Sequence, residues 1–183
     1  MTQGKLRKGI ILIYLLDANT LIDAKRDYYP INRVPEFWSW LVDQGQQGSI
    51  KIPIEVYEEF SDTKDKNGNK DTLASWADEA QVRDSLLFDE EVEQDLVARI
   101  TYGGYVANPT DDELKRMGRD PFLLSYALKD VENRCIVTTE SSKPLRQGAN
   151  RHVPDVCRAF NIRCINSFQM IKEMNFSTGW NML

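Results

Sequence analysis

A continuous apolar run that ends at an acidic residue constrains the fold of this 183-residue chain more than any other feature. Residues 10–16 read Ile-Ile-Leu-Ile-Tyr-Leu-Leu, and Asp17 follows directly. An unbroken apolar run that is rich in β-branched residues is typical of a strand covered on both faces, and such strands belong to parallel sheets. We therefore predict a buried parallel strand with Asp17 at its carboxyl end.

Further strands alternate with helical segments along the rest of the chain. Short strands are predicted at 49–52, 135–139 and 162–165. Helices are predicted directly after the first strand, at 35–46, from 53 to the turn-forming segment 64–70, around 71–82, 89–102 and 110–117, from 120 onward, and at 153–160 and 168–174. This order predicts an α/β fold with a central parallel sheet of four or five strands flanked by helices. We expect one domain over 1–183, with a core at about 10–175 and short N- and C-terminal extensions.

The composition limits the function classes that this chain can belong to. It is 42% hydrophobic and 28% charged, as in an ordinary soluble globular protein. The net charge of −5 argues against a protein that holds duplex nucleic acid through broad phosphate neutralisation. The three cysteines form no C-x-x-C pair, so a reducing cytoplasm fits best. Because the first apolar run is too short to span a bilayer, we expect a cytoplasmic protein with no membrane partner.

Acidic residues follow predicted strands or lie near the start of helices around one edge of the sheet. They are Asp17, Glu55, Glu59, Asp120 and Glu140. Ligands of open parallel sheets bind beyond the carboxyl ends of the strands. Acids gathered there would repel one another unless a cation lay among them, so the pattern predicts a site for Mg²⁺ or Mn²⁺. Two such ions can hydrolyse a phosphodiester without a His or Cys nucleophile, and this chain has only one His.

Each of these acids also has a simpler structural interpretation when it is considered alone. Asp17 and Asp120 could each cap the helix that follows, Asp120 with Pro121 in the first helical position. The glutamates after residue 53 could form a solvated helix face, and Glu140 could be a plain loop residue. Only their convergence in space would favour the metal site over these alternatives.

Four motifs in a fixed order resemble the PIN-domain nucleases. They are LDANTLI at 16–22, IPIEVYEEF at 52–60, DPFLLSYA at 120–127 and IVTTE at 136–140. Together they are similar to a prokaryotic, VapC-like toxin branch of that family, and the resemblance extends from about Ile11 to Glu173. It implies a three-layer PIN-like fold and a Mg²⁺- or Mn²⁺-dependent endoribonuclease that cuts single-stranded RNA. It further implies the toxin of a toxin–antitoxin pair, with an antitoxin protein and a homodimer as expected partners.

The resemblance also assigns residues to the site. It implies that the catalytic acids are Asp17, Glu59, Asp120 and Glu140. Glu59 fits the family pattern because it directly precedes Phe60, although Glu55 lies one helical turn away and stays a candidate. The metal ligands would be Asp17, Asp120 and Glu140, with one departure from the pattern, since the family usually has Asp at the last position. Asp155 could supply or replace that ligand, or could instead act at the amino terminus of its own helix.

Several polar neighbours are candidates for supporting or substrate-binding roles. They are Asn19, Thr20, Thr138, Lys143, Arg146, Arg151 and His152. The first two could hydrogen-bond Asp17 or a metal-bound water, or merely cap a helix. The basic residues of 143–152 could contact RNA phosphates, or could form an exposed loop without such a role.

Two other functions are compatible with the same residues. Asp17-Ala18-Asn19-Thr20 is similar to the Asp-x-Asp-x-Thr signature of haloacid-dehalogenase-type phosphatases, but Asn19 replaces the second Asp and no later Gly-Asp-x-x-x-Asp motif occurs. Alternatively, the chain could be a PIN-like module that binds without cutting. Metal-dependent activity toward RNA and toward small phosphate esters would distinguish the three.

Overall fold

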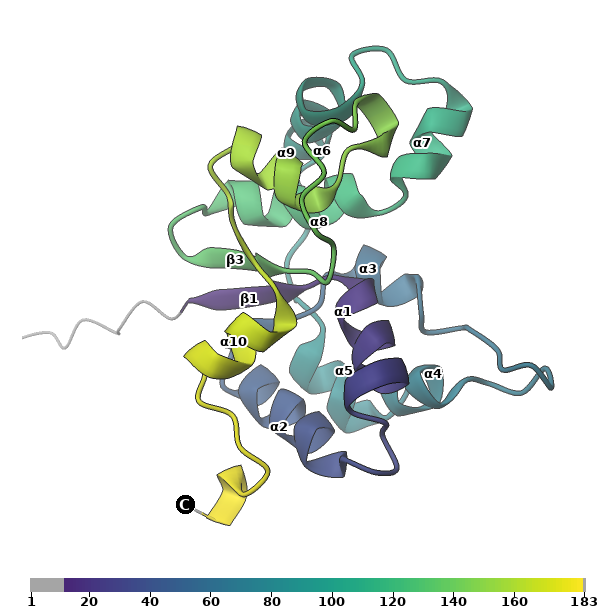
Figure 1. Ribbon diagram of the computed structural model, residues 1–183, viewed down its shortest axis with the longest axis vertical. Coiled ribbons are helices and arrows are strands. Elements are labelled where there is room, and N and C mark those ends of the chain that lie inside the picture. The colour runs from purple at the N-terminus through teal and green to yellow at the C-terminus, as the bar shows by residue number, and fades with distance from the viewer. Residues whose placement is uncertain (1–11, 183) are drawn as a thin grey trace, which may run out of the picture.

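A four-stranded parallel sheet forms the centre of the protein, in a computed structural model that describes residues 12–182 (Figure 1). The strands are β1 (Ile13–Leu16), β2 (Ile50–Lys51), β3 (Arg134–Val137) and β4 (Arg163–Ile165). Their order in the sheet is β2-β1-β3-β4, and every neighbouring pair is parallel. The predicted α/β fold class is therefore confirmed, with four strands in the sheet.

Helices cover both faces of this sheet and complete a three-layer arrangement. Figure 1 shows α6, α7, α8 and α9 on one side and α1, α2, α4, α5 and α10 on the other. The α-helices are α1 (Ala18–Asp23), α2 (Pro35–Gln46), α3 (Ile54–Glu58), α4 (Thr72–Ala77), α5 (Ala80–Leu86), α6 (Gln94–Ile100), α7 (Asp111–Met117), α8 (Asp120–Lys129), α9 (Val153–Ala159) and α10 (Ser167–Glu173). The π-helical turns are η1 (Ala24–Tyr28) and η2 (Thr101–Tyr105), and the 3₁₀ turns are η3 (Gly148–Asn150) and η4 (Trp180–Met182). None of the helices within residues 12–182 is both long enough and apolar enough to cross a membrane.

Some predicted boundaries differ from those of the structure. The predicted helix at 71–82 is two helices, because Glu79 adopts an extended conformation with φ −58° and ψ 129° between α4 and α5. The predicted helix at 89–102 begins only after Glu93, which is also extended, and it widens into the π turn η2. Positions 10 and 11 of the first predicted strand lie outside the described residues. These corrections affect the periphery and leave the order of the core elements unchanged.

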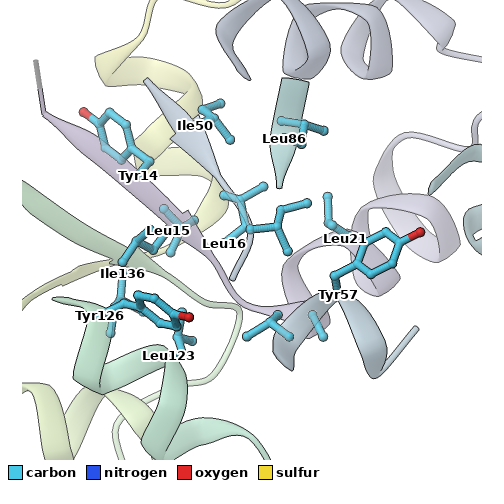
Figure 2. Close-up of a cluster of buried hydrophobic side chains, with 14 of the residues drawn as sticks. Tyr14, Leu15, Leu16, Leu21, Ile50, Tyr57, Leu86, Leu123, Tyr126 and Ile136 are labelled. Atoms are coloured by element: carbon cyan, nitrogen blue, oxygen red, sulfur yellow. The ribbon is translucent and has the colours of Figure 1, made fainter. Parts of the chain in front are cut away.

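The central strands are buried on both faces, as the apolar run predicts. Leu15 and Leu16 of β1 have no exposed surface, and all four residues of β3 are buried. Figure 2 shows β1 between Leu123 of α8 and Leu86 of α5, which come from the two helical layers. Burying a side chain of this size contributes about 1.5–3 kcal/mol. This packing fixes the strand that carries Asp17.

The register of β1 and β3 brings together two segments that carry candidate site residues. Leu16 is paired with Val137, so the residues that follow, Asp17 and Thr138, leave the sheet side by side. The Asp17 N–H donates to the Val137 carbonyl at 2.9 Å and continues this pairing. From β1 the chain moves to β2 on one side, and from β3 it moves to β4 on the other. The edge between β1 and β3 is therefore the switch point at which open α/β sheets form their sites.

Candidate active site

Asp17 is a buried acid that is oriented by Thr138. Its side chain is 4% exposed, and the Thr138 hydroxyl donates to its Oδ2 at 2.7 Å. Although Asp17 stands at the N-cap position of α1, its carboxylate makes no capping hydrogen bond. Burial raises the pKa of Asp17 above its ordinary value, Thr138 opposes the rise, and the charge of Glu140 adds to it. The hydrogen bond from Thr138 is therefore the main polar contact of this carboxylate, and helix capping is not its principal role.

Asp120 is a second acid with an unfavourable environment for its charge. It lies in the first turn of α8 after the N-cap residue Arg119, and no capping hydrogen bond is made there. Burial, followed by the charges of Asp17 and Glu140, raises the pKa of Asp120 well above its ordinary value. The Tyr105 hydroxyl is its hydrogen-bond donor, at a long 3.4 Å. Two acids with raised pKa values thus face one another at this edge.

Tyr105 is a site residue that sequence reasoning missed. It is 8% exposed and comes from the π turn η2, 15 positions before Asp120. Burial and then the charge of Asp120 raise the pKa of its hydroxyl, so the phenol stays protonated and can donate. The Tyr-Gly-Gly-Tyr segment gives no signal of this role, because the π turn that aims the ring inward depends on tertiary packing.

Gly118 shapes the turn that brings Asp120 toward Glu59. Its φ of +55° and ψ of −127° belong to a backbone region that is essentially restricted to glycine. A Cβ at this position would lie 3.6 Å from Glu59 Oε1. Burial, and next the charge of Asp17, raises the pKa of Glu59. Glu59 therefore joins the two aspartates from the end of α3.

Glu140 completes the group from the loop after β3. Its N–H donates to the Thr138 hydroxyl at 3.1 Å, and its Oε2 accepts from the Val153 N–H at 2.8 Å. His152 Nδ1 lies 3.8 Å from the same oxygen, beyond hydrogen-bond distance, and has no other partner. Thr138 thus links both acids, since it donates to Asp17 and accepts from the main chain of Glu140.

These four acids share one electrostatic environment, and we call them the carboxylate cluster: Asp17, Glu59, Asp120 and Glu140. The pKa of Asp120 is raised by the charges of the other three. Within residues 12–182, none of Asp17, Glu59 and Asp120 forms an ion pair with Lys or Arg. In the same part of the chain, no three His, Cys, Asp or Glu side chains are close enough to hold a metal ion as they stand. The cluster is therefore a group of mutually repelling carboxylates that do not surround a single point.

Asp155, the alternative ligand suggested by the sequence, is placed differently. Its carboxylate accepts from the Ser142 hydroxyl and from the Lys143 N–H, the latter at 2.7 Å, and so holds the loop after β3. Burial opposes its charge, but these hydrogen bonds outweigh burial and lower the pKa of Asp155. The sequence left open whether Glu140 or Asp155 is the last acid of the site. In the structure Glu140 lies with the other acids, whereas Asp155 is hydrogen-bonded to the loop after β3.

Three other candidates also lie outside the cluster. The Thr20 hydroxyl donates to the Val137 carbonyl at 2.9 Å, which ties α1 to β3, and Asn19 is exposed. Glu55 lies beside Tyr126, where burial and then the Glu55 charge raise the tyrosine pKa, and its Oε2 is buried without a partner. Glu59, the exposed C-cap residue of α3, is instead the acid of this segment whose pKa is raised by the charge of Asp17.

The predicted basic residues divide into exposed and structural ones. Lys143 and Arg146 are exposed in the loop that Asp155 anchors, and Leu145 between them is 96% exposed. Arg151 instead donates from both terminal nitrogens to main-chain carbonyls, to Gly104 and, at 2.9 Å, to Asp155. Of these three residues, Lys143 and Arg146 present free cationic groups within the described part of the chain, in the loop that follows Glu140.

The fold and the site define a class of parallel α/β proteins with a carboxylate cluster beyond the two central strands. The chain belongs to the family described as a domain of unknown function, DUF4411, whose model matches residues 14–178. The matched range contains most of β1, the other three strands and all four clustered acids. Comparisons with curated proteins and with solved structures found no match.

Proposed function

We propose that this chain is a Mg²⁺- or Mn²⁺-dependent endoribonuclease of the PIN-domain type that cuts single-stranded RNA. The observation that carries the proposal is the carboxylate cluster, in which Asp17 and Asp120 have raised pKa values and no cationic partner. A desolvated carboxylate without a cationic partner is costly, and a divalent cation would offset that cost. Perturbed acids at a switch point are also the usual mark of a functional site.

The chemistry of the cluster fits a hard divalent cation. All of its donors are carboxylate oxygens, which suit Mg²⁺ and Mn²⁺. Mg²⁺ keeps several waters and is commonly held by only one or two carboxylates together with substrate phosphates, so a loose group of acids suits it. When bound, such ions supply an activated water and stabilise the leaving oxygen of a phosphodiester. Asp17, Asp120 and Glu140 would each contribute a carboxylate to such ions, with waters and substrate phosphates completing the coordination, and Glu59 would lie beside Asp17.

The protein's own residues prepare this site in three ways. Thr138 orients the Asp17 carboxylate and, through its acceptor oxygen, fixes the start of the segment that carries Glu140. Tyr105 donates to Asp120 from the buried side. Lys143 and Arg146 offer exposed charges for the phosphates of an incoming strand. The overall charge of −5 favours a single strand held locally over a duplex held by broad contacts.

A cleavage assay tests the proposal directly. Labelled single-stranded RNA is incubated with the purified chain and Mn²⁺, and we expect cleavage that EDTA stops and added Mn²⁺ restores. Hydrolysis of p-nitrophenyl phosphate without RNA cleavage would indicate the phosphatase instead. Metal-dependent RNA binding without either reaction would indicate the binding module.

The toxin part of the proposal has a separate test. If the chain is the toxin of a toxin–antitoxin pair in the cytoplasm, induced expression of the wild type should arrest growth, whereas Asp17→Asn should not. Equal growth of the two strains at equal protein levels would exclude toxicity and leave the nuclease proposal standing. A co-purified antitoxin or a homodimer in size-exclusion chromatography would identify the expected partners.

A further inference from the structure

A groove of about 340 Å³ lies between α6 with η2, α7 and α8. Apolar side chains form most of its lining: Val97, Tyr102, Leu114, Met117, Pro121 and Phe122. Tyr102 is 56% exposed and Leu114 is 45% exposed, although both are large. These three helices lie together on one side of the sheet (Figure 1). Apolar side chains left open in a concave surface of this size are typical of a ligand site.

The groove adjoins the carboxylate cluster through one short turn. Gly118 and Pro121 both line it, while Asp120 between them belongs to the cluster. Gly118 also approaches Glu59, since its Cβ position lies 3.6 Å from Glu59 Oε1. The turn at 118–121 is therefore a wall that the groove shares with the acids. A base is joined to its own phosphate through one sugar, so neighbouring sites of this kind can accommodate the two groups of one nucleotide.

The lining has the chemistry of a base-stacking surface. Tyr102 comes from η2 and Phe122 from α8, and the Arg119 guanidinium lies over the Phe122 ring with Cζ 5.7 Å from its centroid. Proteins that bind single-stranded RNA stack its unpaired bases on aromatic rings and on arginine planes. Gln94 at the same groove adds an amide that can donate to and accept from a base edge.

We propose that this groove binds the nucleobase next to the phosphate that the cluster cleaves, an inference that rests on the proposed nuclease function. The small volume favours a single base, because a protein helix is itself about 10–12 Å wide. Tyr102 is the exposed stacking residue, and Arg119 supports Phe122. The groove gives the enzyme a requirement for an unpaired base at this position.

The test compares two exposed tyrosines. Tyr102→Ala removes the stacking ring, and Tyr28→Ala is the matched control, because Tyr28 is 49% exposed and packs edge-on against Phe168 of α10. Binding of a labelled single-stranded RNA is measured by fluorescence anisotropy without divalent metal. Stacking is typically worth a factor of about five to a hundred in affinity, so Tyr102→Ala should weaken binding by that factor. Tyr28→Ala should change it less than about twofold, and Tyr102→Phe should bind like the wild type.

Cleavage of an abasic RNA identifies what Tyr102 contacts. The wild type should cleave RNA that lacks the single base beside the cut more slowly, and Tyr102→Ala should then add no further loss. An undiminished effect of Tyr102→Ala on the abasic RNA, or wild-type binding by this variant, overturns the inference. Loss of self-association in Tyr102→Ala with unchanged RNA binding would assign the groove to a protein partner and also overturn it. If the wild type binds RNA through Tyr102 but cleaves nothing, the proposed function fails while the groove stays a base site.

Discussion

Two groups of carboxylates near the same edge of the sheet have pKa values that are shifted in opposite directions. Asp155 is saturated by the Ser142 hydroxyl and the Lys143 N–H, and its pKa is lowered. In the carboxylate cluster, Asp17 has one side-chain hydrogen-bond donor and Asp120 a distant one, and both pKa values are raised. Asp17 and Asp155 are both shielded from solvent, at 4% and 6% exposed, but burial is the largest cause of the raised pKa of Asp17, whereas at Asp155 it is outweighed by hydrogen bonds and by the Arg158 guanidinium 3.5 Å away.

The difference teaches how a structural acid can be told from a functional one. A buried charge that is fully hydrogen-bonded stabilises the fold in which it lies. A buried charge beside like charges costs folding free energy, and it persists where a ligand compensates for it. Asp155 therefore belongs to the architecture of the loop, and Asp17 and Asp120 are the acids to which we assign the proposed chemistry.

The largest expected effect comes from the functional side of the comparison, when an acid of the carboxylate cluster is replaced. Asp17→Asn and Asp120→Asn should each reduce Mn²⁺-dependent RNA cleavage by on the order of a thousandfold, because metal ions stabilise the transition state by several kcal/mol. Circular dichroism should show an intact fold in both. The exposed Asp84→Asn is the control and should cleave like the wild type. Full activity in both cluster variants would remove the basis of the site assignment.

Asp155→Ala tests the structural side of the comparison, the role of Asp155 in holding the loop after β3. This change leaves the Lys143 N–H and the Ser142 hydroxyl without their acceptor, and it should lower the free energy of unfolding by about 1–3 kcal/mol. A chain of this size loses about 2–4 °C in Tm per kcal/mol, which differential scanning calorimetry resolves. The lowered pKa of Asp155 means that its contribution is present above its ordinary pKa and is lost as the pH falls through the folded-state value. An unchanged Tm near neutral pH would contradict this role.

Thr138→Val tests the single bond that orients Asp17. The Thr138 hydroxyl lowers the pKa of Asp17, so its removal should raise that pKa further and move the acidic limb of the pH–activity profile to higher pH. Near neutral pH the loss of one hydrogen bond to a charged group should reduce cleavage by about tenfold. Thr138→Ser should restore both the rate and the profile. A uniform loss at every pH would indicate a merely structural role.

The smallest expected effect is on thermal stability in the absence of metal, where the repulsion within the carboxylate cluster can be measured. The pKa values of Asp17 and Asp120 lie above those of the unfolded chain. The favourable contribution of both groups is therefore complete below their ordinary pKa and is lost as the pH rises through the raised values. In EDTA, Asp120→Asn should thus raise the Tm by a few degrees, at about 2–4 °C per kcal/mol, and Mn²⁺ should favour the wild type. A lower Tm for Asp120→Asn in EDTA would count against mutual repulsion in the cluster.

The sequence predicted the features that depend on local patterns. The helix expected at 35–46 is α2, and the apolar run before Asp17 is the buried strand β1. Parallel topology then places the ends of β1 and β3 together, which is why Asp17 and Glu140 could be anticipated as neighbours. Such predictions need only periodicity and the geometry of a parallel sheet.

The features that the sequence did not predict depend on contacts between distant elements. The partner of the Thr20 hydroxyl is 117 positions away, and Tyr105 reaches Asp120 only through a π turn. From the sequence, Arg151 is expected to be a free cation. In the structure its guanidinium donates hydrogen bonds to the main-chain carbonyls of Gly104 and Asp155. No local pattern reports a hydrogen bond between segments that meet only in the folded state.

The Thr138–Asp17 hydrogen bond also has a consequence for biosynthesis, because it joins residues that are 121 positions apart. The central strand β1 leaves the ribosome early, but its neighbour β3 and the loop with Glu140 are made only after the whole of α3 to α8. Sheets with such distant pairings fold late, since the intervening loop must close first. The carboxylate cluster therefore cannot assemble on a nascent chain that ends before β3 and Glu140.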